Sequence, residues 1–195
     1  RTILITGSSR GIGAAIAHEF AAAGDRVAVH YSSAATDAKK VVDSLAGSGH
    51  IIVQADLRNP DAIRAMVDSV AKEFGVIDVL INNAGVFFDH PIESSTYEVW
   101  QQAWADTLGV NLIGAANVTW CALQHMPKNS TSRIVNIGSR GAFRGEPVSP
   151  AYGASKAAIV AFGQSIAKAL APMKIGVTTL APGFVETDMA ARLLD

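Results

Sequence analysis

Six short apolar runs, separated by longer amphipathic segments, are the feature of this sequence that most constrains its fold. Each run is continuously apolar rather than alternating between apolar and polar residues, which is typical of strands that are covered on both faces. The repeated order of strand, helix and strand predicts one parallel sheet with right-handed crossovers and helices on both faces. The expected strands are Thr2–Thr6, Val27–Tyr31, Ile51–Gln54, Val79–Asn82, Ile134–Ile137 and Val177–Ala181.

The segment Asn59–Phe74 has the clearest helical pattern between these runs. Asn59 suits the N-cap, Pro60 suits the first helical position, and Gly75 follows the end of the segment. Further helices are expected over Ala14–Ala23 and Ala151–Ala171. Within Asn59–Phe74, apolar residues recur at helical spacing at Ile63, Met66, Val67, Val70, Ala71 and Phe74.

Composition narrows the possible classes of function. The chain has 195 residues, of which 49% are hydrophobic, and this favours a single domain over residues 1–195. The formal net charge is −1 and the basic residues are not clustered, so no nucleic-acid partner is expected. No apolar stretch approaches the roughly 18 residues of a membrane span, and there is no signal-peptide pattern. With one cysteine and no histidine pair at metal-ligand spacing, we expect a cytoplasmic protein without a metal site.

A glycine-rich turn, TGSSRGIG over Thr6–Gly13, follows the first expected strand and opens the first helix. Glycines allow a tight turn, close approach of the backbone to a pyrophosphate, and close packing of helix on strand. The helix N-terminus also offers free N–H groups and the positive end of its dipole to a phosphate. An ordinary tight turn is the alternative, but a turn between strand and helix favours a dinucleotide site. The candidate cofactor contacts here are Gly7, Ser9, Arg10, Gly11, Ile12 and Gly13.

The TGxxxGxG spacing of this turn resembles that of the short-chain dehydrogenase/reductase family, and the resemblance covers nearly the whole chain. The pair Asp56-Leu57 resembles the family's adenine contact, and the NNAG sequence Asn82–Gly85 resembles its structural segment after the fourth strand. Tyr152 and Lys156 match the YxxxK motif, with Ser139 upstream. The loop that begins at Pro182-Gly183 resembles the family's nicotinamide-side loop. The resemblance implies cofactor contacts from Asp56, Leu57, Asn83, Ala84, Gly85, Tyr152, Lys156, Pro182, Gly183, Val185 and Thr187.

The choice between NAD(H) and NADP(H) depends on the end of the second strand. An acidic residue there binds the ribose 2′-hydroxyl and repels a 2′-phosphate. Here Tyr31, Ser32 and Ser33 follow instead, and no carboxylate occurs before Asp37. Arg10 can reach a 2′-phosphate as a charge-assisted donor, although a solvated surface charge is the alternative. The sequence therefore predicts NADP(H), with contacts from Arg10, Tyr31, Ser32 and Ser33.

Tyr152 and Lys156 are the centre of the predicted catalytic group. They are four residues apart in an expected helix and share one face, which alone would indicate only an amphipathic surface. The pKa of a free tyrosine is about 10. A nearby ammonium and an oxidised nicotinamide are expected to lower it, so that the tyrosine acts as general acid in reduction and general base in oxidation.

Two further polar residues complete the catalytic group that the resemblance implies. Ser139 follows an expected strand, where its hydroxyl can bind the substrate oxygen as negative charge develops; an ordinary turn residue is the alternative. Asn111 resembles the fourth member of the family's tetrad, whose side chain helps to hold a water that links the lysine to solvent. A satisfied amide inside a helix is the alternative for Asn111.

These features predict an NADPH-dependent oxidoreductase that transfers a hydride to the carbonyl carbon of a small molecule. The segment Gly141–Pro147 resembles the 3-oxoacyl-[acyl-carrier-protein] reductase branch, so a 3-oxoacyl thioester is the first candidate substrate. Sugar, steroid and quinone reductases share the same motifs, and a non-catalytic NADP(H)-binding sensor or scaffold is the alternative from another class. The candidates for the pocket entrance are Phe87, Phe88, Phe143, Arg144, Pro147 and Phe184.

Two expectations concern the end of the chain and its assembly. The sequence stops soon after Thr187, so the domain is expected to lack the family's C-terminal lid and last strand. Family relatives pair through helices that correspond to Asn111–Met126 and Ala151–Ala171. The expected assembly is therefore a homodimer or a homotetramer.

Overall fold

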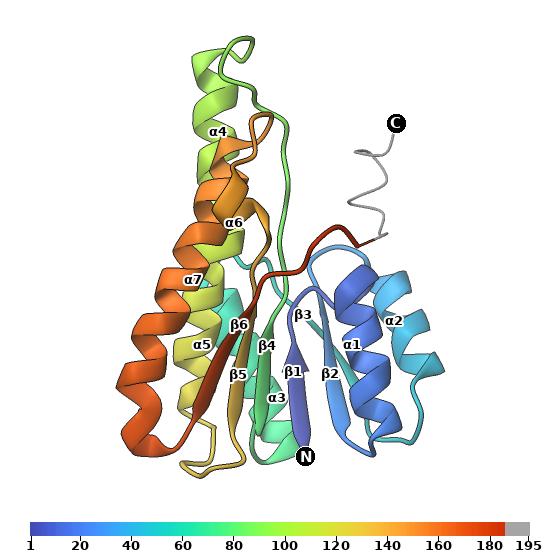
Figure 1. Ribbon diagram of the computed structural model, residues 1–195. Helices are drawn as coiled ribbons and strands as arrows, with labels where there is room; N and C mark the ends of the chain where they lie inside the picture. Colours follow the sequence, from blue (N-terminus) through green and yellow to red (C-terminus); the bar gives the residue numbers. More distant parts are fainter. Residues whose placement is uncertain (186–195) are drawn as a thin grey trace.

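Six parallel strands form one sheet in the order β3-β2-β1-β4-β5-β6 (Figure 1). The computed structural model describes residues 1–185 of the chain. Each predicted strand is present, and its ends differ from the prediction by no more than one residue. The strands are β1 (Thr2–Ile5), β2 (Arg26–Tyr31), β3 (Ile51–Gln54), β4 (Val79–Asn82), β5 (Arg133–Ile137) and β6 (Gly176–Leu180).

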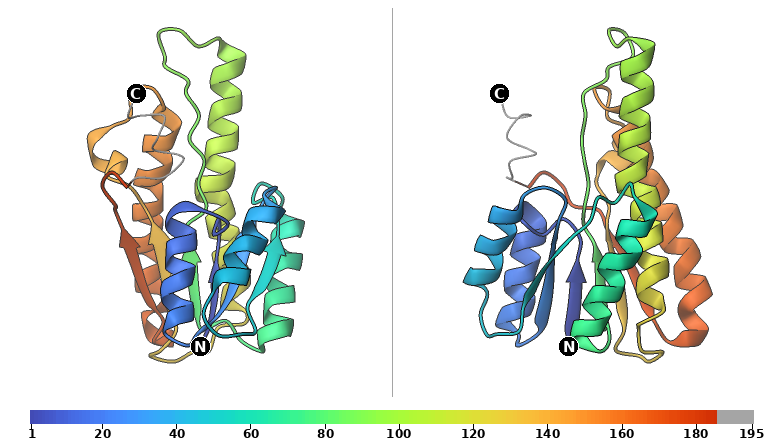
Figure 2. Two further views of the ribbon diagram at one scale, coloured as in Figure 1. Left: turned by 90° about the vertical axis from the view of Figure 1, so that its right-hand side faces the viewer. Right: turned by 180° about the vertical axis from the view of Figure 1, so that it is seen from behind.

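Helices cover both faces of this sheet, which confirms the predicted parallel sheet with two covered faces, a doubly wound α/β fold of the Rossmann type (Figures 1 and 2). On one face, α1 (Gly11–Ala22) and α2 (Ala35–Ser44) enclose a core that includes Ile3 and Ile5 of β1. On the other face, α3 (Pro60–Phe74), α5 (Ala115–Leu123) and α7 (Pro150–Leu170) enclose a second core, to which Leu4 contributes. Successive residues of β1 thus point into different cores, and this is why the strand is apolar without alternation.

Helix α3 forms where the sequence predicts it. The Asn59 side chain accepts hydrogen bonds from the backbone N–H groups of Asp61 and Ala62, at 3.0 and 3.1 Å. Pro60 begins the helix, and Gly75 ends it with a φ of 85°. Removing such an N-cap costs typically about 1 kcal/mol.

Helix α4 (Tyr97–Leu108) and helix α5 are continuous through one π-helical turn, η1 (Gly109–Gly114), which the sequence did not predict. A Cβ at Gly114 would lie 2.6 Å from the carbonyl oxygen of Leu57, so the helix needs glycine to pass this close to the segment after β3. The remaining elements are α6 (Gly141–Arg144) and a 3₁₀ turn, η2 (Ala171–Met173). Helix α4 extends well beyond the sheet (Figures 1 and 2).

Because all six strands are parallel, their carboxyl ends lie at one edge of the sheet. The strand order reverses at β1, which has β2 on one side and β4 on the other. Ligands of doubly wound sheets bind at such a switch point, outside the carboxyl ends of the strands. Within residues 1–185, no helix has the length and apolar character needed to cross a membrane.

Candidate functional site

A cleft of about 710 Å³ runs along the carboxyl ends of the strands. Its volume falls in the range of about 300–1,000 Å³ that is usual for small-molecule sites. Most of the predicted site residues line it, although they come from segments far apart in the chain. They are Gly7, Ser9, Arg10, Gly11, Ile12, Tyr31, Ser32, Ser33, Asp56, Leu57, Asn83, Ala84, Gly85, Ser139, Tyr152, Lys156, Pro182 and Gly183.

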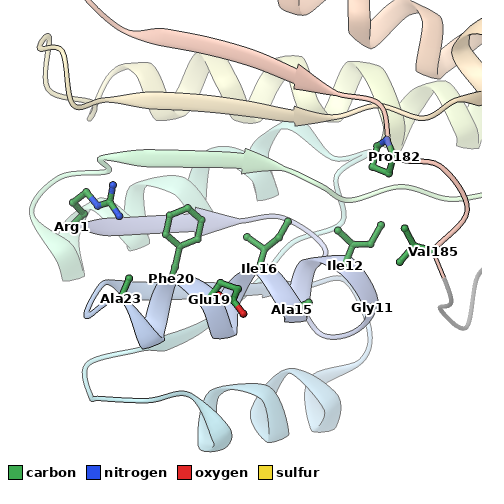
Figure 3. A pocket seen from close by; sticks show the side chains of 10 residues that line it. All are labelled: Arg1, Gly11, Ile12, Ala15, Ile16, Glu19, Phe20, Ala23, Pro182 and Val185. Atoms are coloured by element: carbon green, nitrogen blue, oxygen red, sulfur yellow. The ribbon is translucent and has the colours of Figure 1, made fainter.

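The structure does not place every predicted cofactor contact in this cleft. Gly13 is buried behind the turn, where a Cβ would lie 2.5 Å from the Asn83 Nδ2 and from the Gly7 carbonyl oxygen. Val185 lines a different pocket, an apolar one of about 720 Å³ between α1 and the segment after β6, together with Ile16 and Phe20 of α1 (Figure 3). Neither residue therefore lines the cleft: Gly13 packs closely against Asn83 and Gly7, and Val185 lines the other pocket. Their contacts with a cofactor stay predictions. Thr187 lies outside the described residues.

The glycine-rich turn is held in an anion-binding shape by the NNAG segment. Asn83 Nδ2 donates to the carbonyl oxygens of Thr6 and Gly7, each at 2.9 Å. The Thr6 hydroxyl accepts from the backbone N–H groups of Asn83 and Ala84, each at 3.0 Å. With the turn fixed, the first N–H groups of α1 have no partner within the helix and point to where a phosphate would bind.

His30 is a buried titratable group of the cleft that sequence reasoning did not assign to the site. Its Nδ1 accepts a hydrogen bond from the Gly7 backbone N–H at 2.8 Å, and its Nε2 donates to the Ala55 carbonyl oxygen at 3.1 Å. The ring must therefore be neutral, with its proton on Nε2. Burial lowers the pKa of His30 from 6.5 to about 4. A polar side chain inside an otherwise apolar strand was the one available signal.

The end of the cleft beside β2 carries cationic and hydroxyl side chains. Arg10, Ser32 and Ser33 are exposed there, and Tyr31 is half-buried. The neighbouring carboxylate of Asp56 is paired with Arg58, whose Nη2 lies 2.7 Å from the Asp56 Oδ2. This pairing holds the pKa of Asp56 below its ordinary value.

Arg58 also lines the cleft, and the sequence did not predict its role. Its Nη1 lies 2.7 Å from the Asp106 Oδ1, so the guanidinium joins the end of β3 to helix α4. A Cβ at Gly109 would lie 3.2 Å from the Arg58 Cγ, so the absence of a side chain at Gly109 leaves room for this arginine. The carboxylates of Asp56 and Asp106 favour the cationic form of Arg58 and raise its pKa.

The predicted catalytic side chains lie together at the other end of the cleft. Lys156 is 5% exposed; its Nζ donates to the Ile137 carbonyl oxygen at 2.8 Å and lies 5.6 Å from the centroid of the Tyr152 ring. The Ser139 hydroxyl accepts from the Gly141 backbone N–H at 3.0 Å. The Tyr152 ring also packs on Phe87, with centroids 4.9 Å apart.

The electrostatics of this group correct one expectation. Burial raises the pKa of Tyr152, and the charge of Glu146 raises it further; a hydrogen bond with Ser139 acts in the opposite direction. Burial also lowers the pKa of Lys156 to about 8. In the chain alone the expected lowering of the tyrosine pKa is not found, because desolvation outweighs the hydrogen bond with Ser139. The expectation also counted the positive charge of the oxidised nicotinamide, which belongs to the cofactor and is not part of the chain.

Asn111 lies in η1 behind the cleft wall and is fully hydrogen-bonded within the protein. Its Nδ2 donates to the Val86 carbonyl oxygen at 3.1 Å and to the Ser155 hydroxyl at 3.0 Å. Its Oδ1 accepts from the Val86 backbone N–H at 2.8 Å. Both N–H groups of the amide are used, as expected for a satisfied interior amide. Its participation in a proton relay stays a prediction.

Comparison with known proteins places these features in one family. The sequence matches the short chain dehydrogenase family over residues 1–195. It is 37% identical over 192 residues to a 3-oxoacyl-[acyl-carrier-protein] reductase of Synechocystis sp., covering 97% of this chain and 76% of the relative. It is 34% identical to a protein of the same name from Staphylococcus aureus, covering 100% of this chain and 78% of the relative.

Solved structures give the same result. A short chain dehydrogenase from Burkholderia cenocepacia in complex with NADP has a TM-score of 0.86 and 38% identity, over 96% of this chain and 75% of that one. A blue fluorescent protein from a metagenomic library in complex with NADPH has a TM-score of 0.87 and 34% identity, over 97% of this chain and 76% of that one. The chain belongs to the short-chain dehydrogenase family, the family of oxidoreductases that its motifs resemble.

Proposed function

We propose that this protein is an NADPH-dependent reductase that converts the carbonyl group of a small molecule to an alcohol. The observation that carries the proposal is the arrangement of the cleft. A dinucleotide-binding turn lies at one end, and Ser139, Tyr152 and Lys156 converge at the other. A cofactor laid along the cleft joins the two ends. The named relatives and the NADP-bound and NADPH-bound neighbours support this interpretation.

The residues present fit a phosphorylated dinucleotide. The turn leaves N–H groups free at the start of α1, and a Cβ at Gly7 would lie 2.7 Å from the Ala84 Cα, so the backbone is as close-packed as a pyrophosphate site requires. At the adenosine end, Arg10, Ser32 and Ser33 provide donors for a 2′-phosphate. The sequence provides no carboxylate there to bind an unphosphorylated ribose. This combination favours NADP(H) over NAD(H).

The bound nicotinamide supplies the hydride, and the chain positions the carbonyl and provides the proton. Ser139 holds the substrate oxygen, and the Tyr152 hydroxyl donates the proton to that oxygen as it gains negative charge. Lys156 would bind the hydroxyls of the nicotinamide ribose through its Nζ, which lies 3.5 Å from the position of a Cβ at Gly85 in the cleft lining. Asn111, whose Oδ1 accepts only one hydrogen bond within residues 1–185, helps to hold a water in the path by which Lys156 and Tyr152 are reprotonated.

The substrate that we propose is a 3-oxoacyl thioester. The support comes from the relatives, which are named for reducing 3-oxoacyl groups, and from the aromatic side chains of Phe87 and Phe88 on the cleft wall. The test is oxidation of NADPH, with NADH alongside, against 3-oxoacyl thioesters, diketones, quinones and ketosugars. Turnover on 3-oxoacyl thioesters supports the proposal. Turnover only on another class would show that the substrate belongs to that class instead.

The Tyr152→Phe variant separates an enzyme from a non-catalytic cofactor-binding protein. The variant removes only the hydroxyl, so kcat should fall by about 10²–10⁴ while the Kd for NADPH changes little. The Kd is measured by NADPH fluorescence and kcat by NADPH oxidation. Equal turnover by the variant and the parent would show that the proton comes from elsewhere. Tight NADPH binding by a parent without turnover on any class would favour a sensor or scaffold.

We also propose that the protein forms homodimers through the face of η1 and α5. Ile113 and Trp120 are 55% and 60% exposed on these elements, and exposed large apolar side chains of this kind mark contact surfaces. Sedimentation of the parent and of a Trp120→Glu variant tests this. A monomeric parent would contradict it, as would a variant that stays dimeric.

A further inference from the structure

We propose that His90 is a positioning residue that holds the start of helix α7, and with it Tyr152, against the cleft wall Val86–His90. The inference rests on the proposed function, because His90 would control the placement of the Tyr152 hydroxyl, which is the proton donor of the proposed reaction. His90 is completely buried, although it is polar and lies outside any helix or strand. No motif and no step of the proposed reaction uses it.

The contacts of the His90 ring define its protonation state. Its Nε2 accepts a hydrogen bond from the Ala151 backbone N–H at 3.1 Å, so this nitrogen carries no proton. Its Nδ1 lies 2.7 Å from the Phe88 carbonyl oxygen, so this nitrogen carries the proton. The ring is therefore neutral, in one tautomer. The edge of the ring also meets Trp100, with centroids 5.5 Å apart.

Helix α7 needs this partner because it has no N-cap of the usual kind. The first N–H groups of a helix have no partner within it, and a Ser side chain at the N-cap commonly binds one of them. Here Ser149 occupies the N-cap but makes no such bond, and Pro150 has no N–H group. Ala151 therefore offers the first N–H of the helix, in a position that is 0% exposed. His90 satisfies it, and the next residue is Tyr152.

The same histidine ends a wall segment that is fixed at both of its ends. At one end, Asn111 binds both the N–H and the C=O of Val86. At the other end, the backbone N–H of His90 donates to the Val148 carbonyl oxygen at 2.8 Å. Between them, Phe87 packs on the Tyr152 ring and lines the cleft with Phe88.

The wall and the catalytic helix are thus one unit, and His90 is the link at the helix end. If the link is lost, the first turn of α7 can shift relative to the wall. A misplacement of about 1 Å at a reacting group can cost about 10²-fold in rate. The glycine-rich turn is held by other residues, Thr6 and Asn83, so cofactor affinity should not follow the change.

Two substitutions of His90 separate its two hydrogen bonds. The amide oxygen of glutamine in His90→Gln is as many bonds from Cα as Nε2 and can accept from Ala151. The shorter amide in His90→Asn reaches only the position of Nδ1, so it keeps the bond to Phe88 and loses Ala151. His18→Asn, on the exposed surface of α1, is the control for handling and expression.

The expected result is a loss of kcat by about 10- to 100-fold in His90→Asn, recovery to within about threefold of the parent in His90→Gln, and an unchanged Kd for NADPH in both. Equal losses in the two variants, or losses that follow the folded fraction and the Kd, would show a merely structural role and overturn the proposal.

Hydrogen exchange at the Ala151 and Tyr152 amides provides a readout that does not depend on activity. Protection of Ala151 in the parent and in His90→Gln, but not in His90→Asn, supports the link even if no substrate is found. In that case the proposed function fails while the positioning role of His90 stands. Equal protection in all three proteins would overturn the link itself.

Discussion

Neutral His30 should make the stability of this protein depend on pH in a range where few other side chains titrate. Its pKa is about 4 in the folded chain and 6.5 when it is free of the fold. Between these values the unfolded chain binds a proton that the folded chain does not. The free energy of unfolding therefore falls as the pH falls from about 6.5 to about 4, and is fully retained above 6.5. The difference of about 2.5 pKa units corresponds to about 3 kcal/mol.

The variant His30→Asn isolates this contribution. Its amide oxygen lies where Nδ1 lies and can accept from the Gly7 N–H, but the side chain is too short to reach the Ala55 carbonyl oxygen. At pH 7 the variant should be less stable by about 1–3 kcal/mol, the cost of one unsatisfied buried group. This deficit should shrink as the pH falls and close near pH 4, because only the parent has a histidine to protonate at this position.

Urea unfolding at constant ionic strength, at intervals from pH 7 to pH 4, measures both curves. Groups that are common to the two proteins cancel in the difference between them, so the difference reports His30 alone. Parallel curves, with a deficit that changes by less than about 0.5 kcal/mol over this range, would refute the argument that the ring is held neutral by burial and by the Gly7 N–H.

Three further predictions follow from other contacts. Gly13→Ala should destabilise the chain by about 1–3 kcal/mol in urea unfolding and weaken NADPH binding, because the new Cβ meets atoms at 2.5 Å. The control Gly183→Ala should leave the stability unchanged, because nothing in the described part of the chain lies within 4 Å of its Cβ. Equal losses of stability in the two variants would contradict this prediction. Arg10→Ala should weaken NADPH by about 10- to 100-fold and leave the Kd for NADH nearly unchanged in fluorescence titrations; equal weakening would refute the 2′-phosphate contact. Lys156→Met should abolish turnover. The pKa of Lys156 is about 8 in the folded parent and 10.5 in the unfolded parent, so between these values only the unfolded parent binds the proton. The free energy of unfolding of the parent therefore rises by about 3 kcal/mol from pH 8 to pH 10.5. The variant lacks this gain, so its stability relative to the parent should fall by the same amount. A constant difference would show that burial does not control this lysine.

The strands and the main helices could be predicted because their signals are local. Continuous apolar runs indicate buried strands, and Asn59, Pro60 and Gly75 mark the ends of α3 within a few residues of sequence. The cleft could be predicted because its motifs follow strands whose ends meet at one edge of the sheet. That Gly13 and Val185 do not line the cleft could not be predicted, because a motif does not state which way a residue faces.

The remaining features depend on contacts between distant parts of the chain. His30 binds the turn 23 residues before it, and His90 binds a helix that begins about 60 residues later. Burial of this kind is not visible in a local pattern. The same holds for Tyr152, whose pKa depends on how completely Phe87 and its other neighbours exclude water. Sequence reasoning considered its charged neighbours and could not weigh the desolvation.

The bonds between Asn83 and the glycine-rich turn also bear on the order of folding. The turn is complete in the first 13 residues of sequence, but the amide that braces it arrives only with the end of β4. A fragment that ends before β4 would contain every glycine of the motif and lack the side chain that holds their carbonyl oxygens in place. During synthesis, we therefore expect the ability to retain a dinucleotide to arise only after β4 has paired with β1.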